Sequence, residues 1–168
     1  GDWDVGSGQY FVHWDVEHHT MSTWPYFPLP PQYPCWAGFD YGWSHPTSVH
    51  FFTQIGEMVY TLAEHVQSYW LPQQHAAALE TIARKLGRPL DRILFHAGHD
   101  VFAKDHRGVT IANEYAKHGI RLVPANTNRE QGAAAMLNRL GNPEAGQAPT
   151  WLIYHDCPRL IETIPGLM

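Results

Sequence analysis

A regular pattern of apolar and polar positions begins only after a proline-rich opening stretch. Five prolines fall between positions 25 and 34, and they exclude a helix there because proline lacks the backbone donor and clashes with the preceding turn. We expect short extended pieces in this stretch, with one brief strand over 9–14. Residues 1–34 are therefore interpreted as a lead-in or connector segment, and residues 35–168 as the folded domain.

Three strands are predicted in close succession from residue 35. The first is the apolar run 35–41, which contains an acid at position 40 and is followed by a glycine at position 42. The second covers 48–54, and the third covers 58–64 after the turn-forming pair Gly56-Glu57. Connections this short favour an antiparallel meander.

Helical and strand patterns then alternate. Three helices are predicted by apolar residues at helical spacing, over 72–86, 109–118 and 130–140. Further strands are expected over 92–96, 120–123 and 151–154, and a short helix over 159–164. Three consecutive strands followed by alternating elements predict an α/β domain with a mixed central sheet flanked by helices. This order of elements resembles the RNase H-like arrangement, which is the fold we expect.

Composition narrows the class of protein. The chain has 168 residues, of which 44% are hydrophobic and 16% charged, so it is long enough for one packed domain and unlike a disordered chain. We find neither a membrane-spanning apolar run nor a signal peptide, and expect a soluble, intracellular protein. Cys35 and Cys157 form no CxxC pair, and the twelve histidines fit no common zinc spacing.

Charge is unevenly distributed along the chain. The net charge is −5, yet all eleven Lys and Arg residues fall between Arg84 and Arg159. Up to position 83 there are eight acids and no Lys or Arg. An acidic part beside a mildly basic part suits a metal–carboxylate site with a flank that meets phosphates. Chance clustering on a solvated surface is the alternative.

Asp40 is the first candidate for chemistry. It ends an apolar strand and is followed by Tyr41-Gly42, where the chain must turn. A carboxylate at a strand end is fixed by the sheet, and Mg²⁺ and Mn²⁺ prefer such hard oxygen ligands. The alternative is an Asp that caps a turn.

Asp100 is the second candidate, because it also follows the end of a predicted strand. If the two strands are neighbours, Asp40 and Asp100 face each other across a short gap. Two carboxylates that close repel unless cations bridge them. Two ions about 4 Å apart would activate a water and stabilise the leaving oxygen of a phosphodiester. Asp100 as a cap of the next turn is the alternative.

The order of motifs resembles the C-terminal nuclease domain of the large terminase subunit of tailed bacteriophages. Four stretches carry the resemblance, and they occur in the order of that family: 1–4 (GDWD) with 8–11 (GQYF), 38–42 (GFDYG) with 46–49 (PTSV), 98–100 (GHD), and 119–126 with 129–132 (REQG). Together they extend over nearly the whole chain. No phosphate-loop motif GxxxxGK[ST] occurs, so an ATPase domain is not expected here.

The resemblance implies an endonuclease that cleaves double-stranded DNA during viral genome packaging. It implies Asp40 and Asp100 as ligands of two Mg²⁺ or Mn²⁺ ions, and a late acid as a further ligand. We expect that acid beyond residue 168, with Asp156 as a less favoured substitute. The implied partners are an ATPase domain, the small terminase subunit and the portal, in the cytoplasm of a bacterial host and without a membrane.

Other residues are weaker candidates. Glu64 ends the third predicted strand and can add a metal ligand or be a solvated strand-end acid; His99 can orient a ligand or be a turn residue. Four basic side chains are expected near the DNA backbone, where only positive charge is required: Arg121, Arg129, Lys104 and Arg107. The rival interpretations are another RNase H-like nuclease, of the resolvase or transposase type, and a non-catalytic truncated remnant.

Overall fold

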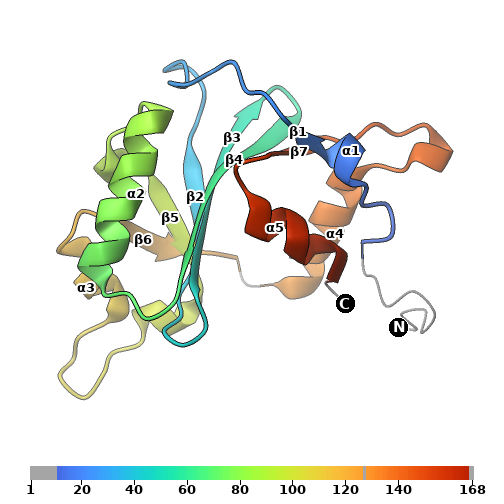
Figure 1. Ribbon diagram of the computed structural model, residues 1–168. Coiled ribbons are helices and arrows are strands. Elements are labelled where there is room, and N and C mark those ends of the chain that lie inside the picture. Colours follow the sequence, from blue (N-terminus) through green and yellow to red (C-terminus); the bar gives the residue numbers. More distant parts are fainter. Residues whose placement is uncertain (1–10, 127, 167–168) are drawn as a thin grey trace.

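The computed structural model describes residues 11–126 and 128–166, without the side chains of 129, 130, 132 and 133 (Figure 1). In this part of the chain seven strands form one sheet, in the order β1-β7-β4-β3-β2-β5-β6. The strands are β1 (Thr20–Met21), β2 (Trp36–Asp40), β3 (Thr47–Ile55), β4 (Met58–Gln67), β5 (Leu94–Ala97), β6 (Arg121–Pro124) and β7 (Trp151–Tyr154). The α-helices are α1 (Val16–His19), α2 (Pro72–Leu86), α3 (Ile111–Ala116), α4 (Arg129–Leu140) and α5 (Pro158–Thr163). None of the described helices is both long and apolar enough to cross a bilayer.

The sheet is mixed. β2, β3 and β4 form the expected antiparallel meander. β5 pairs in parallel with β2, β6 with β5, β7 with β4, and β1 with β7. The strands β2, β4, β5 and β6 consequently all end at the same edge of the sheet, which we call the carboxyl edge. This arrangement confirms the α/β, mixed-sheet fold predicted from the sequence.

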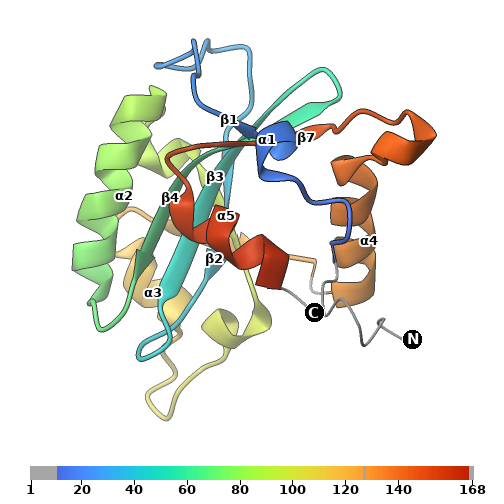
Figure 2. The same ribbon diagram turned by 45° about the vertical axis from the view of Figure 1, so that its right-hand side comes forward.

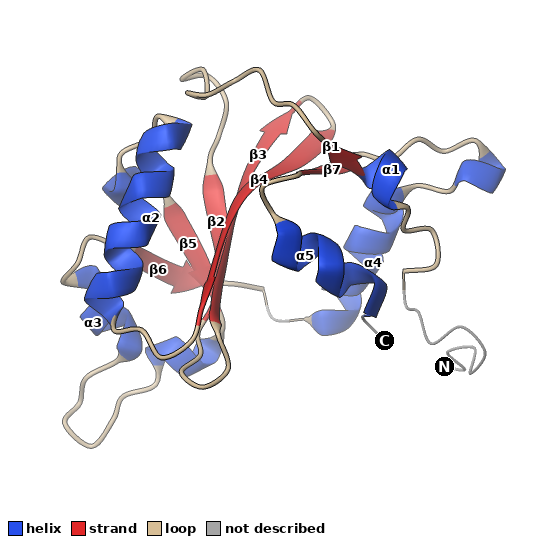
Figure 3. Cartoon of the chain, in the orientation of Figure 1, coloured by secondary structure: helices blue, strands red, loops and turns tan. Residues whose placement is uncertain are grey.

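Helices cover both faces of the sheet. Figures 1 and 3 show α2 and α3 on one face and α4 and α5 on the other. The first face buries Phe39, Phe51 and Phe95 against Leu79 of α2 and Tyr115 of α3. The second face holds a smaller core, formed by Phe11, Leu140, Trp151, Ile153, Cys157 and Ile164.

Local signals explain the best-defined elements. Helix α2 begins at Pro72. Proline is well tolerated there, because the N–H groups of a first turn have no acceptor within the helix. It ends before Gly87, which adopts a left-handed φ of 71° and donates its N–H to the last turn. The predicted bounds of 72–86 and, for β7, of 151–154 agree with the structure.

Other expectations need correction. The expected strand over 9–14 reaches beyond the described residues at 9 and 10, and its described part forms a turn in which Trp14 N–H donates to Phe11 O. α1 and the two-residue β1 lie in the segment interpreted as a lead-in, and Leu29 packs into the larger core. β4 continues to Gln67 rather than ending at Glu64, because residues 65–67 still pair with the first residues of β3. The register between the two strands shifts between Phe51 and Phe52.

Candidate metal centre at the carboxyl edge

Asp40 and Asp100 are brought together by adjacent parallel strands. Asp40 is the last residue of β2, and Phe39 immediately before it pairs with Ala97, the last residue of β5. Asp100 follows β5 in a short 3-10 turn over His99–Phe102. Both carboxylates therefore belong to the carboxyl edge, as the sequence predicted from their positions after strand ends.

Alternation along β2 decides which face Asp40 occupies. Ala37 and Phe39 are buried in the core beneath α2 and α3, so Gly38 and Asp40 point to the other face, on the side of α5. The Asp100 carboxylate folds back over Gly98, where an added Cβ would stand 3.1 Å from Asp100 Oδ1. Glycine at position 98 thus leaves room for the second acid.

The electrostatics of the pair are those of two like charges in partly desolvated surroundings. Burial raises the pKa of Asp40 above its ordinary value, and the negative charge of Asp100 raises it further. Ionising both carboxylates together therefore costs free energy in the isolated protein. A divalent cation between them would remove that cost, because it favours both charged forms.

The donor set fits a hard, partly hydrated cation. Two carboxylates with water in the remaining positions match the way proteins bind Mg²⁺, which keeps several waters and takes one or two carboxylates. Within residues 11–126 and 128–166, no group of three or more His, Cys, Asp or Glu side chains is arranged to hold a metal. The described residues thus offer a two-carboxylate site, and a third ligand beyond residue 168 remains a prediction.

The turn after Asp40 is tightly built. Thr47 Oγ1 accepts a hydrogen bond from Gly42 N–H at 3.1 Å and donates one to Gly42 O at 2.8 Å. A Cβ at Gly42 would collide with the carbonyl oxygens of His45 and Pro46. The start of β3 therefore holds the chain just past Asp40, and this fixes where β2 ends.

Glu64 has a different environment from the one expected of a strand-end metal ligand. Its side chain is 6% exposed, and Oε2 lies 3.0 Å from His50 Nε2. Oε1 accepts from Arg159 N–H at 2.7 Å, and Oε2 also accepts from Leu160 N–H at 3.1 Å. Burial acts to raise the pKa of Glu64, but these hydrogen bonds together lower it. Glu64 thereby caps the first turn of α5, whose own N-cap residue makes no side-chain cap bond.

The basic candidates occupy three separate places. Arg121 begins β6, in the row of Trp36 and Leu94, and therefore lies four residues along the sheet from the end of β2. Lys104 and Arg107 lie in the loop after the Asp100 turn, where Arg107 pairs with Asp105 at 2.8 Å. The side chain of Arg129, at the start of α4, lies outside the described residues. Of the four, those in the 103–110 loop are nearest in sequence to Asp100.

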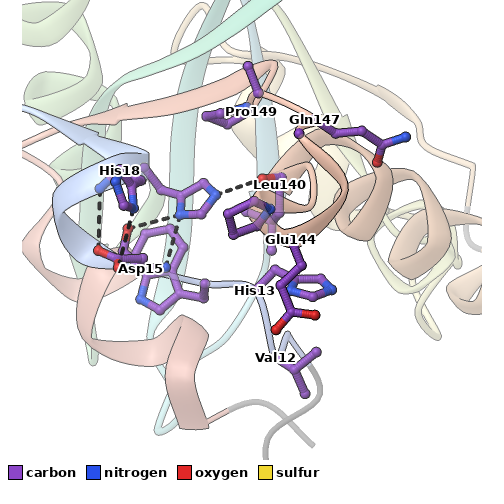
Figure 4. Close-up of a pocket in the computed structure, with 13 residues that line it drawn as sticks. Val12, His13, Asp15, His18, Leu140, Glu144, Gln147 and Pro149 are labelled. Atoms are coloured by element: carbon purple, nitrogen blue, oxygen red, sulfur yellow. Dashed lines mark hydrogen bonds and ion pairs between the residues drawn. The ribbon is translucent and has the colours of Figure 1, made fainter.

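A pocket lies away from the acid pair, between the lead-in segment and the loop after α4 (Figure 4). Its volume is about 490 Å³, and its wall includes His13, His18 and Glu144. His19 is buried there, with Nε2 2.8 Å from Leu140 O. This contact attaches the lead-in segment to the end of α4, so His19 has a packing role.

Sequence reasoning missed a groove beside Asp40, lined among others by Ser48 and His50 of β3 and by Arg159 of α5. The alternation of β3 carried a signal for the first two, because Val49 and Phe51 are apolar and the positions that alternate with them lie on the opposite face, which is that of Asp40. Arg159 carried none, since only the tertiary fold brings α5 to this face.

Comparison with known proteins identifies the fold. No protein-family profile and no curated protein matches the sequence. The nuclease domain of the P22 large terminase matches with a TM-score of 0.71 over 94% of this chain and 78% of that domain, at 16% identity. The large terminase nuclease of thermophilic phage G20c, in a structure with bound magnesium, matches with a TM-score of 0.60 over 94% of this chain and 79% of that one, at 12% identity.

A longer large terminase, from another thermophilic bacteriophage, matches with a TM-score of 0.65 at 14% identity. That match covers 93% of this chain but 36% of the longer protein, so this chain spans about a third of it. The fold is thus that of large-terminase nuclease domains, as the resemblance in sequence implied.

Proposed function

We propose that this chain is a metal-dependent endonuclease domain of the large-terminase type, which cleaves DNA phosphodiester bonds during viral genome packaging. One observation carries the proposal: Asp40 and Asp100 meet at the ends of adjacent parallel strands, on a fold shared with phage nucleases. A carboxylate such as Asp40, whose pKa is raised by burial and by a neighbouring acid, is common at functional sites.

Asp40 and Asp100 would hold Mg²⁺ or Mn²⁺, and two ions are the working hypothesis. The structure of the G20c nuclease with bound magnesium supports a divalent cation. When bound, such cations activate water for attack and stabilise the leaving oxygen of a phosphodiester. Gly98 and the Gly42–Thr47 turn would keep the two carboxylates in place, and the proposal includes no covalent bond between this chain and DNA.

The remaining assignments extend the same proposal. Double-stranded DNA would be the substrate, with Lys104, Arg107, Arg121 and Arg129 as contacts to its backbone. The longer large terminase, of which this chain matches about a third, was also solved with ATP-γ-S. We therefore propose an ATPase domain, a small terminase subunit and a portal as partners, in the cytoplasm of a host bacterium.

Nicking of supercoiled plasmid in Mn²⁺ tests the function. We expect the wild-type protein to convert supercoiled DNA to the open circle, and EDTA or Asp40→Ala to abolish the conversion. Gly38→Ala is the matched control, because a Cβ there meets only Phe52 at 3.8 Å. Equal nicking by wild type and Asp40→Ala would refute the role of Asp40.

Two rival functions are separated by further outcomes. Absence of nicking by the wild-type protein at any Mn²⁺ concentration would favour a non-catalytic domain, for which the two-carboxylate donor set of the described residues is the supporting observation. Cleavage of branched DNA in strong preference to linear duplex would favour a nuclease of the resolvase type.

A further inference from the structure

Helix α5 and strands β3 and β4 enclose a groove on the face of the sheet that carries Asp40. Figure 2 shows α5 lying in front of these strands, on the opposite side from α2. The groove has a volume of about 260 Å³ and is lined by Ser48, His50, Val66, Arg159 and Thr163, among others. It is distinct from the acid pair, and none of the described residues in its wall is acidic.

The groove begins directly beside Asp40. Ser48 is the ladder partner of Asp40 across β2 and β3, and directly opposite residues in an antiparallel pair have Cα atoms about 4.5–5.5 Å apart. Both side chains point to the same face, because Phe39 and its partner Val49 are buried on the other. A DNA strand with its scissile phosphate at Asp40 therefore meets this groove with its neighbouring backbone.

The groove offers hydrogen-bond donors, from Arg159 and Ser48, whereas the carboxylates of Asp40 and Asp100 can only accept hydrogen bonds. Among the described residues, the Arg159 guanidinium takes part in no ion pair. Arg159 is exposed, while its backbone N–H is held by Glu64. A guanidinium matches two phosphate oxygens in a fork, and a serine hydroxyl can donate to a third.

Glu64 gives the groove its rigidity. Its carboxylate accepts hydrogen bonds from the first two available N–H groups of α5, those of Arg159 and Leu160, and also contacts His50 on β3. The Arg159 backbone is therefore fixed relative to β3 before any ligand arrives. These three contacts stabilise the negative charge of Glu64, so the Arg159 guanidinium is left available to bind a phosphate.

We propose that Arg159 and Ser48 form a phosphate subsite that holds the DNA backbone next to the scissile phosphodiester, with Glu64 as the residue that positions α5. This inference rests on the proposed nuclease function and names a substrate contact for it. The competing occupant of the groove is an acidic segment of a protein partner. Loss of duplex binding in Arg159→Gln would favour DNA, and unchanged duplex binding would favour the acidic segment.

Binding of a labelled duplex in the absence of divalent cations tests the subsite, because no cleavage then competes. Each phosphate contact contributes about 0.9 to the slope of log K against log salt concentration. We expect Arg159→Gln to lower that slope by about 0.9, while Arg159→Lys keeps it because it keeps the charge. We expect Ser48→Ala, which leaves α5 untouched, to weaken binding about three- to tenfold.

The matched control is Arg84→Gln, which removes an exposed arginine that pairs with Glu80 on α2, on the other face. Its slope should equal that of the wild-type protein. Thermal melting of each variant shows that the fold is retained. An unchanged slope and affinity in Arg159→Gln, an equal loss in Arg84→Gln, or no duplex binding by the wild type would each overturn the subsite. Plasmid nicking tests the nuclease function separately. If the wild-type protein nicks plasmid but Arg159→Gln has the same salt dependence of binding as the wild type, only the subsite is refuted.

Discussion

Replacing Glu64 by glutamine separates a structural cap from a metal ligand. The carboxylate accepts hydrogen bonds from Arg159 N–H, Leu160 N–H and His50, and an amide keeps only one oxygen to accept them. Hydrogen bonds to a charged group contribute about 1.5–3 kcal/mol and neutral ones about 0.5–1.5 kcal/mol. Since Arg159 N–H is near the surface and water can replace part of the loss, we expect Glu64→Gln to cost about 2 kcal/mol of folding free energy.

That cost corresponds to a fall in Tm of about 4–8 °C for a chain of this length. The measurement is thermal melting by circular dichroism in EDTA and again with added Mn²⁺. Glu57→Gln, in the exposed hairpin turn, is the control. Because the pKa of Glu64 is lowered in the fold, its contribution is fully present above the ordinary glutamate pKa and is lost as the pH falls below it, through the lowered pKa of the folded protein. The gap between wild type and Glu64→Gln should therefore close in acid.

Two results would refute this account of Glu64. An unchanged Tm in EDTA would mean that the cap contributes nothing. Loss of the Mn²⁺-induced rise in Tm, with normal stability in EDTA, would mean that Glu64 is a metal ligand after all.

Three further predictions concern the candidate metal centre and the core. Asp40→Asn removes a charge whose ionisation is costly in the fold, so in EDTA its Tm should equal or exceed that of the wild type, whereas the Mn²⁺-induced rise should vanish; a rise equal to that of the wild type would contradict it. Gly42→Ala, by collision with the His45 and Pro46 carbonyls, should cost about 1–3 kcal/mol in urea unfolding, while Gly38→Ala should be tolerated. His65 lies 2.8 Å from His75, and burial, aided by charge on His75, lowers its pKa to about 4. The unfolded chain therefore takes up protons first, and stability should fall as the pH drops from about 6.5 towards 4; a His65→Gln variant with the same pH dependence would contradict this.

Local patterns predicted those parts of the fold that have local causes. Helix α2 was predictable because Pro72 and Gly87 mark its ends. β1 was not, because two residues form a strand only through pairing with β7, far along the sequence. The end of β4 was misplaced because the register shift near Phe52 interrupts its alternation.

The same distinction applies to the candidate site. The closeness of Asp40 and Asp100 was predictable, because Asp40 ends β2, Asp100 follows β5, and neighbouring parallel strands end at one edge of the sheet. The surroundings of Glu64 depend on contacts with α5 that no spacing encodes, and so does the groove lined by Arg159. The placement of residues at strand ends is thus predictable from sequence, whereas contacts across the faces of the sheet require the structure.

The anomalous scattering of Mn²⁺ in crystals of the protein tests the central claim most directly. We expect an anomalous peak within coordinating distance of both Asp40 and Asp100, and its loss in crystals of Asp40→Asn. A peak at Glu64, or none at the carboxyl edge at saturating Mn²⁺, would contradict the assignment of the metal centre.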